Sequence, residues 1–216
     1  MTEAEWLATE DVKPLIAYLV DSLPEARRYD WGARERRKWL FILACADPIW
    51  PLLPVEQQLA LKLFDPDAQE VLDDDSRHAR WSTALEVEWD HAGLLFALNF
   101  DQVDSFCQVA VEIAAARHAV DRENWSRREQ REQTKIFRDI FGNPFRLVAF
   151  DSAWRTPTVT SLAQAIYDER RFADLPILAD ALEDAGCTSA DVLEHCRTPG
   201  EHVRGCWVVD LVLGKS

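Results

Sequence analysis

Apolar residues recur at spacings of three and four along most of this sequence, and this period constrains its fold more than any other feature. After Asp11, for example, the pattern runs through Val12, Leu15, Ile16 and Leu19. Such spacing places the apolar side chains on one face of an α-helix, whereas a strand alternates with a period of two. The chain also has only 7 glycines in 216 residues, which argues against a fold with many tight turns. The sequence therefore predicts an all-α fold.

Helices are expected wherever this period recurs between turn signals. The expected ranges are about 12–23, 33–46, 55–64, 77–141, 159–167, 175–185, 188–196 and 201–213. The range 77–141 is long enough for two or three helices. Thr2 and Glu5 have the spacing of a capping box, and Thr158 is expected to cap the helix that follows it. Residues 147–150 are expected to add a short extended piece, and residues 207–209 are ambiguous between helix and strand.

The clearest break in the sequence is Gly142-Asn143-Pro144-Phe145. Glycine suits the position after the end of a helix, and Asn-Pro favours a turn. We therefore expect two parts, an N-terminal helical bundle over residues 1–141 and a smaller C-terminal helical module over residues 142–216.

The chain is acidic, with 24 Lys and Arg residues against 38 Asp and Glu residues and a formal net charge of −14. Binding to nucleic acid needs clustered basic residues that release counterions from phosphates. The densest basic segments, residues 34–38 and 127–131, are interleaved with glutamates, a mixture typical of a solvated helix face. We therefore expect no nucleic-acid partner.

The sequence also bears on location. No segment approaches the ~20 apolar residues that a membrane helix requires, so we expect no membrane partner. Residues 1–5 are acidic and lack the basic start and apolar stretch of a signal peptide. A cytoplasmic location is expected, and the 5 scattered cysteines are expected to be free thiols there.

Four sequence motifs in the C-terminal part are the most distinctive: DIFGNPFR at 139–146, AIYDER at 165–170, LPILADALEDAGC at 175–187 and HVRGCW at 202–207. Together with residues 1–7 and 49–53, they resemble an uncharacterised family expanded in planctomycete bacteria such as Gemmata. The resemblance is close in the C-terminal part and looser near the N-terminus, and it implies no activity. Residues 44–48 depart from the family pattern, which has a Cys-x-Cys-Cys-Arg-Arg stretch there, so no cysteine chemistry carries over.

The C-terminal part concentrates residues that can ligate a metal. They are Cys187, His195, Cys196, His202 and Cys206. Zinc prefers four Cys or His ligands, but the spacing C-x7-H-C-x5-H-x3-C matches no standard zinc knuckle. His195 and Cys196 are neighbours and point about 100° apart on a helix, which leaves His202 and Cys206 as the one ready pair. We predict no metal ligand and no cofactor, with a zinc site as the alternative.

A cryptic hydrolase is the other alternative. Cys206 with His202 or His195 could form a nucleophile and base, which requires a neighbouring cation to lower the pKa of the thiol. Asp180 and Glu183 could act as paired carboxylates, but their spacing is that of a solvated helix face. No phosphate-binding glycine loop or nucleophilic serine motif occurs. We therefore expect no catalytic residue.

The hypothesis favoured by the sequence is a non-enzymatic protein-interaction or regulatory module. Aromatic residues are abundant, with 9 tryptophans and 10 phenylalanines, and they can form a protein-binding surface. In the break at 142, two phenylalanines flank the turn and an arginine follows, although the same phenylalanines could instead pack the two parts together. The residues expected to bind a protein partner are Phe141, Asn143, Phe145, Arg146, Trp154, His202 and Arg204.

Overall fold

The computed structural model describes residues 1–21, 31–63, 65–67, 121–146 and 148–215. Within these ranges all regular structure is helical and no strand occurs, so the predicted all-α fold is confirmed. None of the helices described is long and apolar enough to span a bilayer. The helices expected between residues 77 and 120 lie outside the described ranges.

The chain divides into two compact units, Met1–Thr134 and Lys135–Ser216. The boundary lies inside helix α7 (Arg122–Phe141) and not at Gly142, where the sequence places it. The last turns of α7, which carry Asp139, therefore belong to the C-terminal unit.

The N-terminal unit begins with the predicted capping box. The Thr2 hydroxyl accepts a hydrogen bond from the Glu5 amide (3.3 Å), and the Glu5 carboxylate accepts one from the Thr2 amide (2.7 Å). Its helical elements, apart from the start of α7, are α1 (Glu3–Ala8), α2 (Val12–Asp21), α3 (Trp31–Ala46), the 3-10 helix η2 (Asp47–Leu52) and α4 (Val55–Leu63). Trp6 of α1 is fully buried and meets the ring of Tyr18 of α2 edge-on, so these two helices share an apolar contact.

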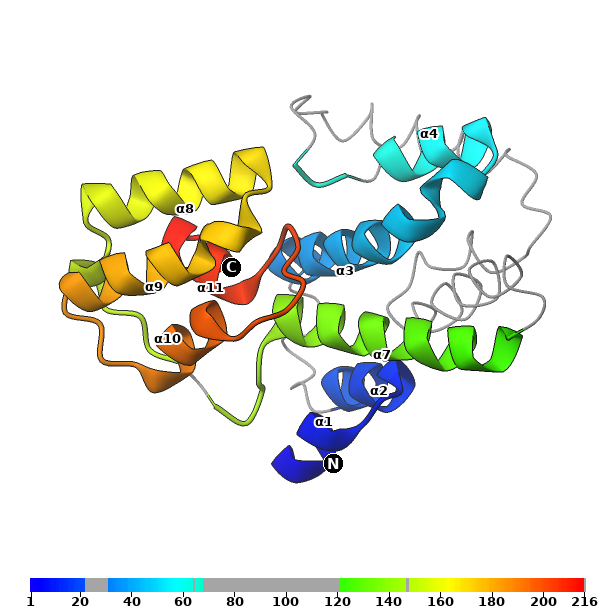
Figure 1. Ribbon diagram of the computed structural model, residues 1–216, viewed down its shortest axis with the longest axis horizontal. Helices are drawn as coiled ribbons and strands as arrows, with labels where there is room; N and C mark the ends of the chain where they lie inside the picture. The colour runs from blue at the N-terminus through cyan, green and yellow to red at the C-terminus, as the bar shows by residue number, and fades with distance from the viewer. Residues whose placement is uncertain (22–30, 64, 68–120, 147, 216) are drawn as a thin grey trace. The chain divides into compact units, whose positions relative to one another are not determined.

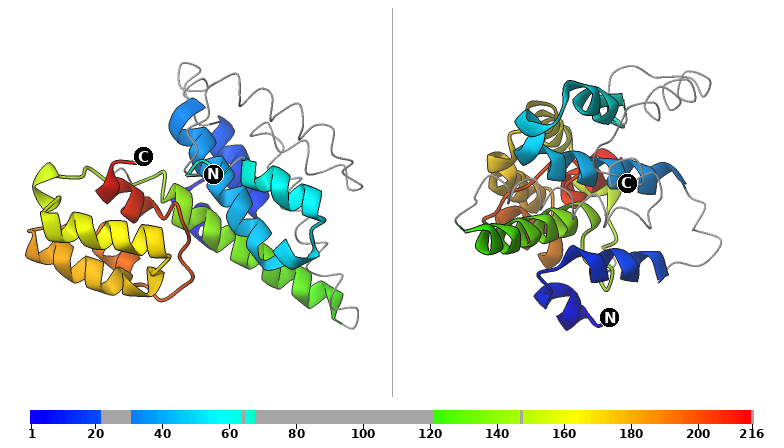
Figure 2. Two further views of the ribbon diagram at one scale, coloured as in Figure 1. Left: turned by 90° about the horizontal axis from the view of Figure 1, so that it is seen from above. Right: turned by 90° about the vertical axis from the view of Figure 1, so that its right-hand side faces the viewer.

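The C-terminal unit is a set of short helices around an aliphatic core. After the last turns of α7, its elements are the 3-10 helix η5 (Ser152–Trp154), α8 (Pro157–Glu169), the 3-10 helix η6 (Phe172–Asp174), α9 (Leu175–Asp184), α10 (Ala190–Arg197) and α11 (Trp207–Leu213). Helix α9 packs against α8 and α10, and α11 packs against α8 (Figures 1 and 2). Side chains from all four α-helices fill the core, among them Ile166, Leu178, Val192 and Val209.

Two predicted helix starts are wrong. Helix α8 is capped by Thr156, whose hydroxyl accepts from the Val159 amide (3.3 Å), and not by Thr158, because Pro157 occupies the first helical position. Helix α11 begins at Trp207 and not at residue 201, because Gly205 has a φ of +98°, which no helix accommodates. Residues 148–150 form no strand.

Candidate metal centre

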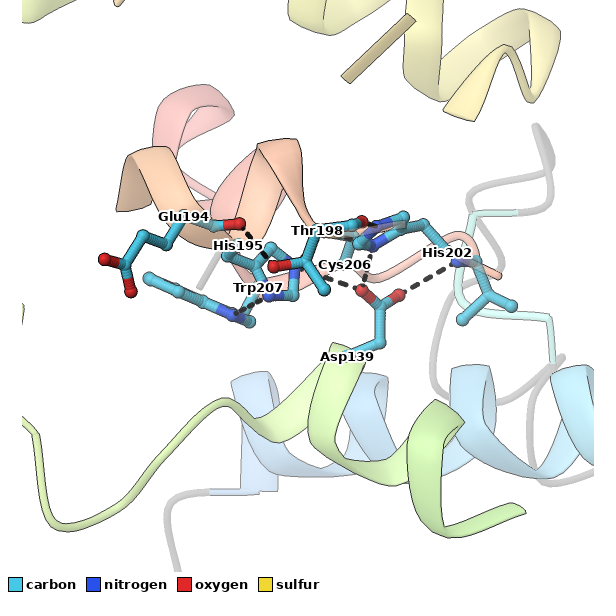
Figure 3. A network of polar contacts seen from close by, with 8 residues as sticks. Asp139, Glu194, His195, Thr198, His202, Cys206 and Trp207 are labelled. Atoms are coloured by element: carbon cyan, nitrogen blue, oxygen red, sulfur yellow. Dashed lines mark hydrogen bonds and ion pairs between the residues drawn. The ribbon is translucent and has the colours of Figure 1, made fainter. Parts of the chain in front are cut away.

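Four side chains of the C-terminal unit converge through one donor atom each. They are Asp139, His195, His202 and Cys206, and the four donor atoms lie within 4.8 Å of one another. We call these four residues the donor cluster. Figure 3 shows Asp139 reaching from α7 towards His195 of α10 and towards the loop that carries His202 and Cys206.

A tight turn brings two of these residues together. The Cys206 amide donates to the Val203 carbonyl (3.0 Å), which closes a β-turn over residues 203–206. Gly205 occupies the third position of this turn with a φ of +98°, a conformation that glycine adopts without strain. His202 and Cys206 therefore flank a turn, whereas the sequence interpretation placed them one helical turn apart.

The donor atoms are spaced closely enough to share one small partner. Nε2 of His195 lies 3.1 Å from Oδ1 of Asp139 and 3.1 Å from Sγ of Cys206. Nδ1 of His202 lies 2.6 Å from the same Oδ1 and 4.0 Å from the same Sγ. Both imidazole rings thus point a nitrogen at the one carboxylate oxygen and at the one sulfur.

The carboxylate of Asp139 is held in a fixed orientation. Its Oδ2 accepts a hydrogen bond from the Val203 amide (2.9 Å), which leaves Oδ1 facing the two histidines. Burial on its own would raise the pKa of Asp139, but hydrogen bonds from His195 and His202, together with the electrostatic attraction of the two rings, outweigh it and lower that pKa. Asp139 therefore remains ionised although it is only 4% exposed.

The two histidines differ in what their outer nitrogens meet. Nε2 of His202 faces the Thr198 carbonyl at 3.5 Å, which can only accept. Nδ1 of His195 lies 3.1 Å from Nε1 of Trp207, which can only donate. Burial would lower the pKa of His202, but the hydrogen bond and charge of Asp139 prevail and raise it.

Cys206 supplies the sulfur of the donor cluster and is fully buried. Burial, followed by the neighbouring charge of Asp139, raises the pKa of its thiol well above the ordinary value. The thiol therefore stays protonated unless a cation enters the cluster and stabilises the thiolate.

This geometry does not form a catalytic triad. In a triad, the nucleophile and the acid approach different nitrogens of the histidine. Here Sγ of Cys206 and Oδ1 of Asp139 both approach Nε2 of His195. Together with the raised pKa of the Cys206 thiol, this arrangement disfavours nucleophilic chemistry and favours the shared binding of a cation.

Only part of the predicted Cys/His group converges. Cys187 and Cys196 lie in the aliphatic core, at 2% and 1% exposure, and not in the donor cluster. Burial, with smaller contributions from the charges of Asp139 and Cys187, raises the pKa of Cys196 to about 12. The expectation that His195 and Cys196 cannot easily share one metal agrees with this arrangement.

The residues predicted to bind a partner around the 142 break have internal contacts. The ring of Phe141 stacks on that of Phe137 at 4.4 Å, and the Asn143 side chain accepts from the Phe145 amide (3.0 Å). Arg146 is exposed and forms an ion pair with Asp191. These contacts stabilise the turn and leave partner binding a prediction.

Three further residues were predicted to bind a partner. Trp154 is half-buried, with its ring against that of Phe150 at 5.2 Å, and it packs on the aliphatic core. Arg204 is half-buried in the β-turn. His202 belongs to the donor cluster. Partner binding by these three residues stays a prediction.

Asp139 is the member of the donor cluster that the sequence interpretation missed. One signal was available in the sequence. Asp139 lies between Phe137 and Ile140 in the last turn of α7, among the apolar residues of that helix. A negative charge at a helix C-terminus interacts unfavourably with the helix dipole. An acidic residue that lies there, next to an apolar stripe, therefore indicates a cationic partner nearby.

The resemblance to a planctomycete family stays a prediction and does not bear on the geometry of the donor cluster. Comparison with models of known families, with curated proteins and with solved structures found no match for this chain.

Proposed function

We propose that the C-terminal unit is a zinc-binding module and that the ion holds its fold together. One observation carries this proposal: four potential ligand atoms from Asp139, His195, His202 and Cys206 lie within 4.8 Å of one another. Aspartate, histidine and cysteine all bind zinc in proteins, and a mixed set of nitrogen, sulfur and oxygen ligands suits this ion.

The spacing of the atoms suits a tetrahedral ion. Ligand atoms at ordinary zinc distances are separated by about 3.3–3.7 Å. Four of the donor separations in the cluster are 2.6, 3.1, 3.1 and 4.0 Å, so the atoms need to move only by amounts of about 1 Å or less to surround zinc.

Charge balance supports the same ion. Two positive charges on zinc equal the negative charges of the Asp139 carboxylate and the Cys206 thiolate, and the two imidazoles bind in their neutral form. The resulting centre is neutral overall, which reduces the cost of burying it.

We propose a structural role for the ion because four protein ligands complete a tetrahedral site, whereas a catalytic zinc keeps a position for water or substrate. The ligands come from α7, from α10 and from the loop before α11, so one ion ties together three segments of a small unit. Small units gain most from such a staple. A metal-held scaffold also agrees with the non-enzymatic interaction or regulatory role expected from the sequence.

The test uses the full chain, stripped of metal with a chelator and then dialysed against zinc. We expect one zinc per chain by elemental analysis, and about 4 kcal/mol of added stability at a free zinc concentration of 1,000 times Kd. Cobalt(II) in place of zinc should give a sulfur-to-cobalt charge-transfer band.

Two serine variants provide a matched comparison. Cys206→Ser should lose the charge-transfer band and most of the zinc, because it removes a ligand. Cys196→Ser, equally buried but outside the donor cluster, should keep both. A wild-type protein that takes up no zinc, or a Cys206→Ser protein that binds it as tightly as wild type, would overturn the proposal.

A further inference from the structure

The two histidines of the donor cluster are prepared for metal to different degrees. A histidine that binds metal through one nitrogen carries its proton on the other and donates it to a carbonyl or carboxylate. His202 can adopt this arrangement, because its Nε2 faces the Thr198 carbonyl at 3.5 Å and can keep a proton there once Nδ1 gives up the proton that it donates to Asp139. His195 has Nε2 in the cluster, but its outer nitrogen faces a donor.

The donor is the indole of Trp207. Its Nε1–H lies 3.1 Å from Nδ1 of His195, and an indole nitrogen has no lone pair to accept with. Nδ1 must therefore be the bare nitrogen of the ring, and the proton lies on Nε2. That proton occupies the position from which His195 would bind an ion, with Oδ1 of Asp139 and Sγ of Cys206 each 3.1 Å from Nε2.

We propose that Trp207 acts as a latch: its hydrogen bond to Nδ1 holds His195 in the metal-free tautomer, and zinc binding must break this hydrogen bond. This inference rests on the proposed zinc site. When zinc binds Nε2, the Nε2 proton goes to solvent and Nδ1 takes up a proton from water, so His195 carries the same number of protons before and after. The Cys206 thiol gives its proton to solvent. Two N–H groups then face each other, and the indole must turn away from Nδ1.

Packing keeps the indole in the latched position. The ring of Trp207 is half-buried, with its centroid 5.1 Å from that of His195. On another side it packs against Gly142, where an added Cβ would be 3.4 Å from Cγ of Trp207. Because releasing the hydrogen bond costs free energy, the latch weakens zinc binding. Trp207 is thus a positioning residue that acts through His195.

The first test is Trp207→Phe in the full chain, which keeps an aromatic ring and removes the N–H. The loss of one competing hydrogen bond should make zinc binding about two- to tenfold tighter, measured by competition with a chromophoric chelator. If Trp207 only supported the fold, the variant would bind zinc more weakly or equally, and either result overturns the latch. Trp154→Phe, a half-buried tryptophan of the same unit outside the cluster, should bind zinc as wild type does.

The second test follows the latch in the wild-type chain and uses the variant only to assign one signal. In proton–nitrogen NMR spectra, the indole signal of Trp207 is the one missing from Trp207→Phe. Zinc should shift this signal upfield as its hydrogen bond breaks, and leave the indole signal of Trp154 in place. Zinc uptake without a shift of the Trp207 signal would overturn the latch and leave the zinc site standing. No zinc uptake at all would overturn both.

Discussion

The C-terminal unit buries side chains in two regions of opposite character, and neighbouring residues of α10 belong to different ones. Cys196 lies in the aliphatic core with Cys187, whereas His195 lies in the donor cluster. The third thiol, that of Cys206, is buried where the two regions meet. The comparison teaches that burial keeps the thiols of Cys196 and Cys206 protonated, and that the chemistry open to each depends on which donor atoms lie beside it.

The two regions also stabilise the fold by different means. Contacts in the aliphatic core are non-directional and their contribution scales with the apolar area buried. Contacts in the donor cluster are directional, because each buried polar group needs a partner with the right geometry. Truncating one side chain should therefore disturb only its neighbours in the aliphatic core, whereas in the donor cluster it should leave several hydrogen-bonding groups without a partner.

The largest effect is expected for Asp139→Ala. The carboxylate accepts from the Val203 amide and faces ring nitrogens of both histidines, so its loss leaves three half-buried polar groups without this acceptor. We expect the metal-free chain to lose about 4 kcal/mol of unfolding free energy, measured by urea unfolding followed by circular dichroism. Zinc binding should be lost as well.

Asp139→Asn is the control for this change, since it keeps the shape and one acceptor oxygen. It should lose less stability than the alanine variant and still bind zinc poorly, because a neutral amide is a weak zinc ligand. An alanine variant as stable as wild type would mean that the donor cluster contributes nothing to the fold without metal.

A somewhat smaller effect, with the opposite pattern, is expected for Leu178→Ala in the aliphatic core. Leu178 is fully buried, and its truncation should cost about 3 kcal/mol through lost burial and a cavity. Zinc affinity and stoichiometry should match wild type, because no ligand moves. A large loss of zinc affinity in this variant would show that the two regions are not separable.

The fold could be predicted from the sequence because the helical period reports directly which residues are buried together. Helices such as α9 and α10 were predicted within a residue or two of their observed ends, and the Thr2 cap in full. The misplaced start of α11 has a local cause. The apolar period continues through residues 201–206, and nothing in it reveals the positive φ that Gly205 adopts.

The donor cluster could be predicted only in part, for a different reason. His202 and Cys206 are close in sequence, so their spacing already suggests a pair. Asp139 joins them through the packing of α7 within the C-terminal unit, a tertiary contact that no local period encodes. The division expected at Gly142 also assigned Asp139 to the other domain, which hid the relation.

An intermediate effect is expected for Gly205→Ala. At a φ of +98° a Cβ strains the backbone, so the β-turn between His202 and Cys206 should distort at a cost of about 1–2 kcal/mol. Zinc affinity, measured by chelator competition, should fall because the two ligands lose their spacing. Gly200→Ala is the matched control in the same loop, since a Cβ there meets nothing within 4 Å. Equal zinc affinity in both variants would mean that the turn does not set the ligand spacing.

The smallest effect is expected for Arg197→Ala. Its guanidinium bridges α10 to α9 through Asp180 (2.8 Å) and Glu183 (2.6 Å), but its side chain is 41% exposed. Water and salt screen such a pair, so the thermal midpoint should stay close to wild type and zinc binding should not change. The same two helices also meet through the aliphatic core, where Leu178 and Val192 are fully buried. If Arg197→Ala lowered the thermal midpoint as far as Leu178→Ala does, the surface ion pair and not the core would be what joins α9 to α10.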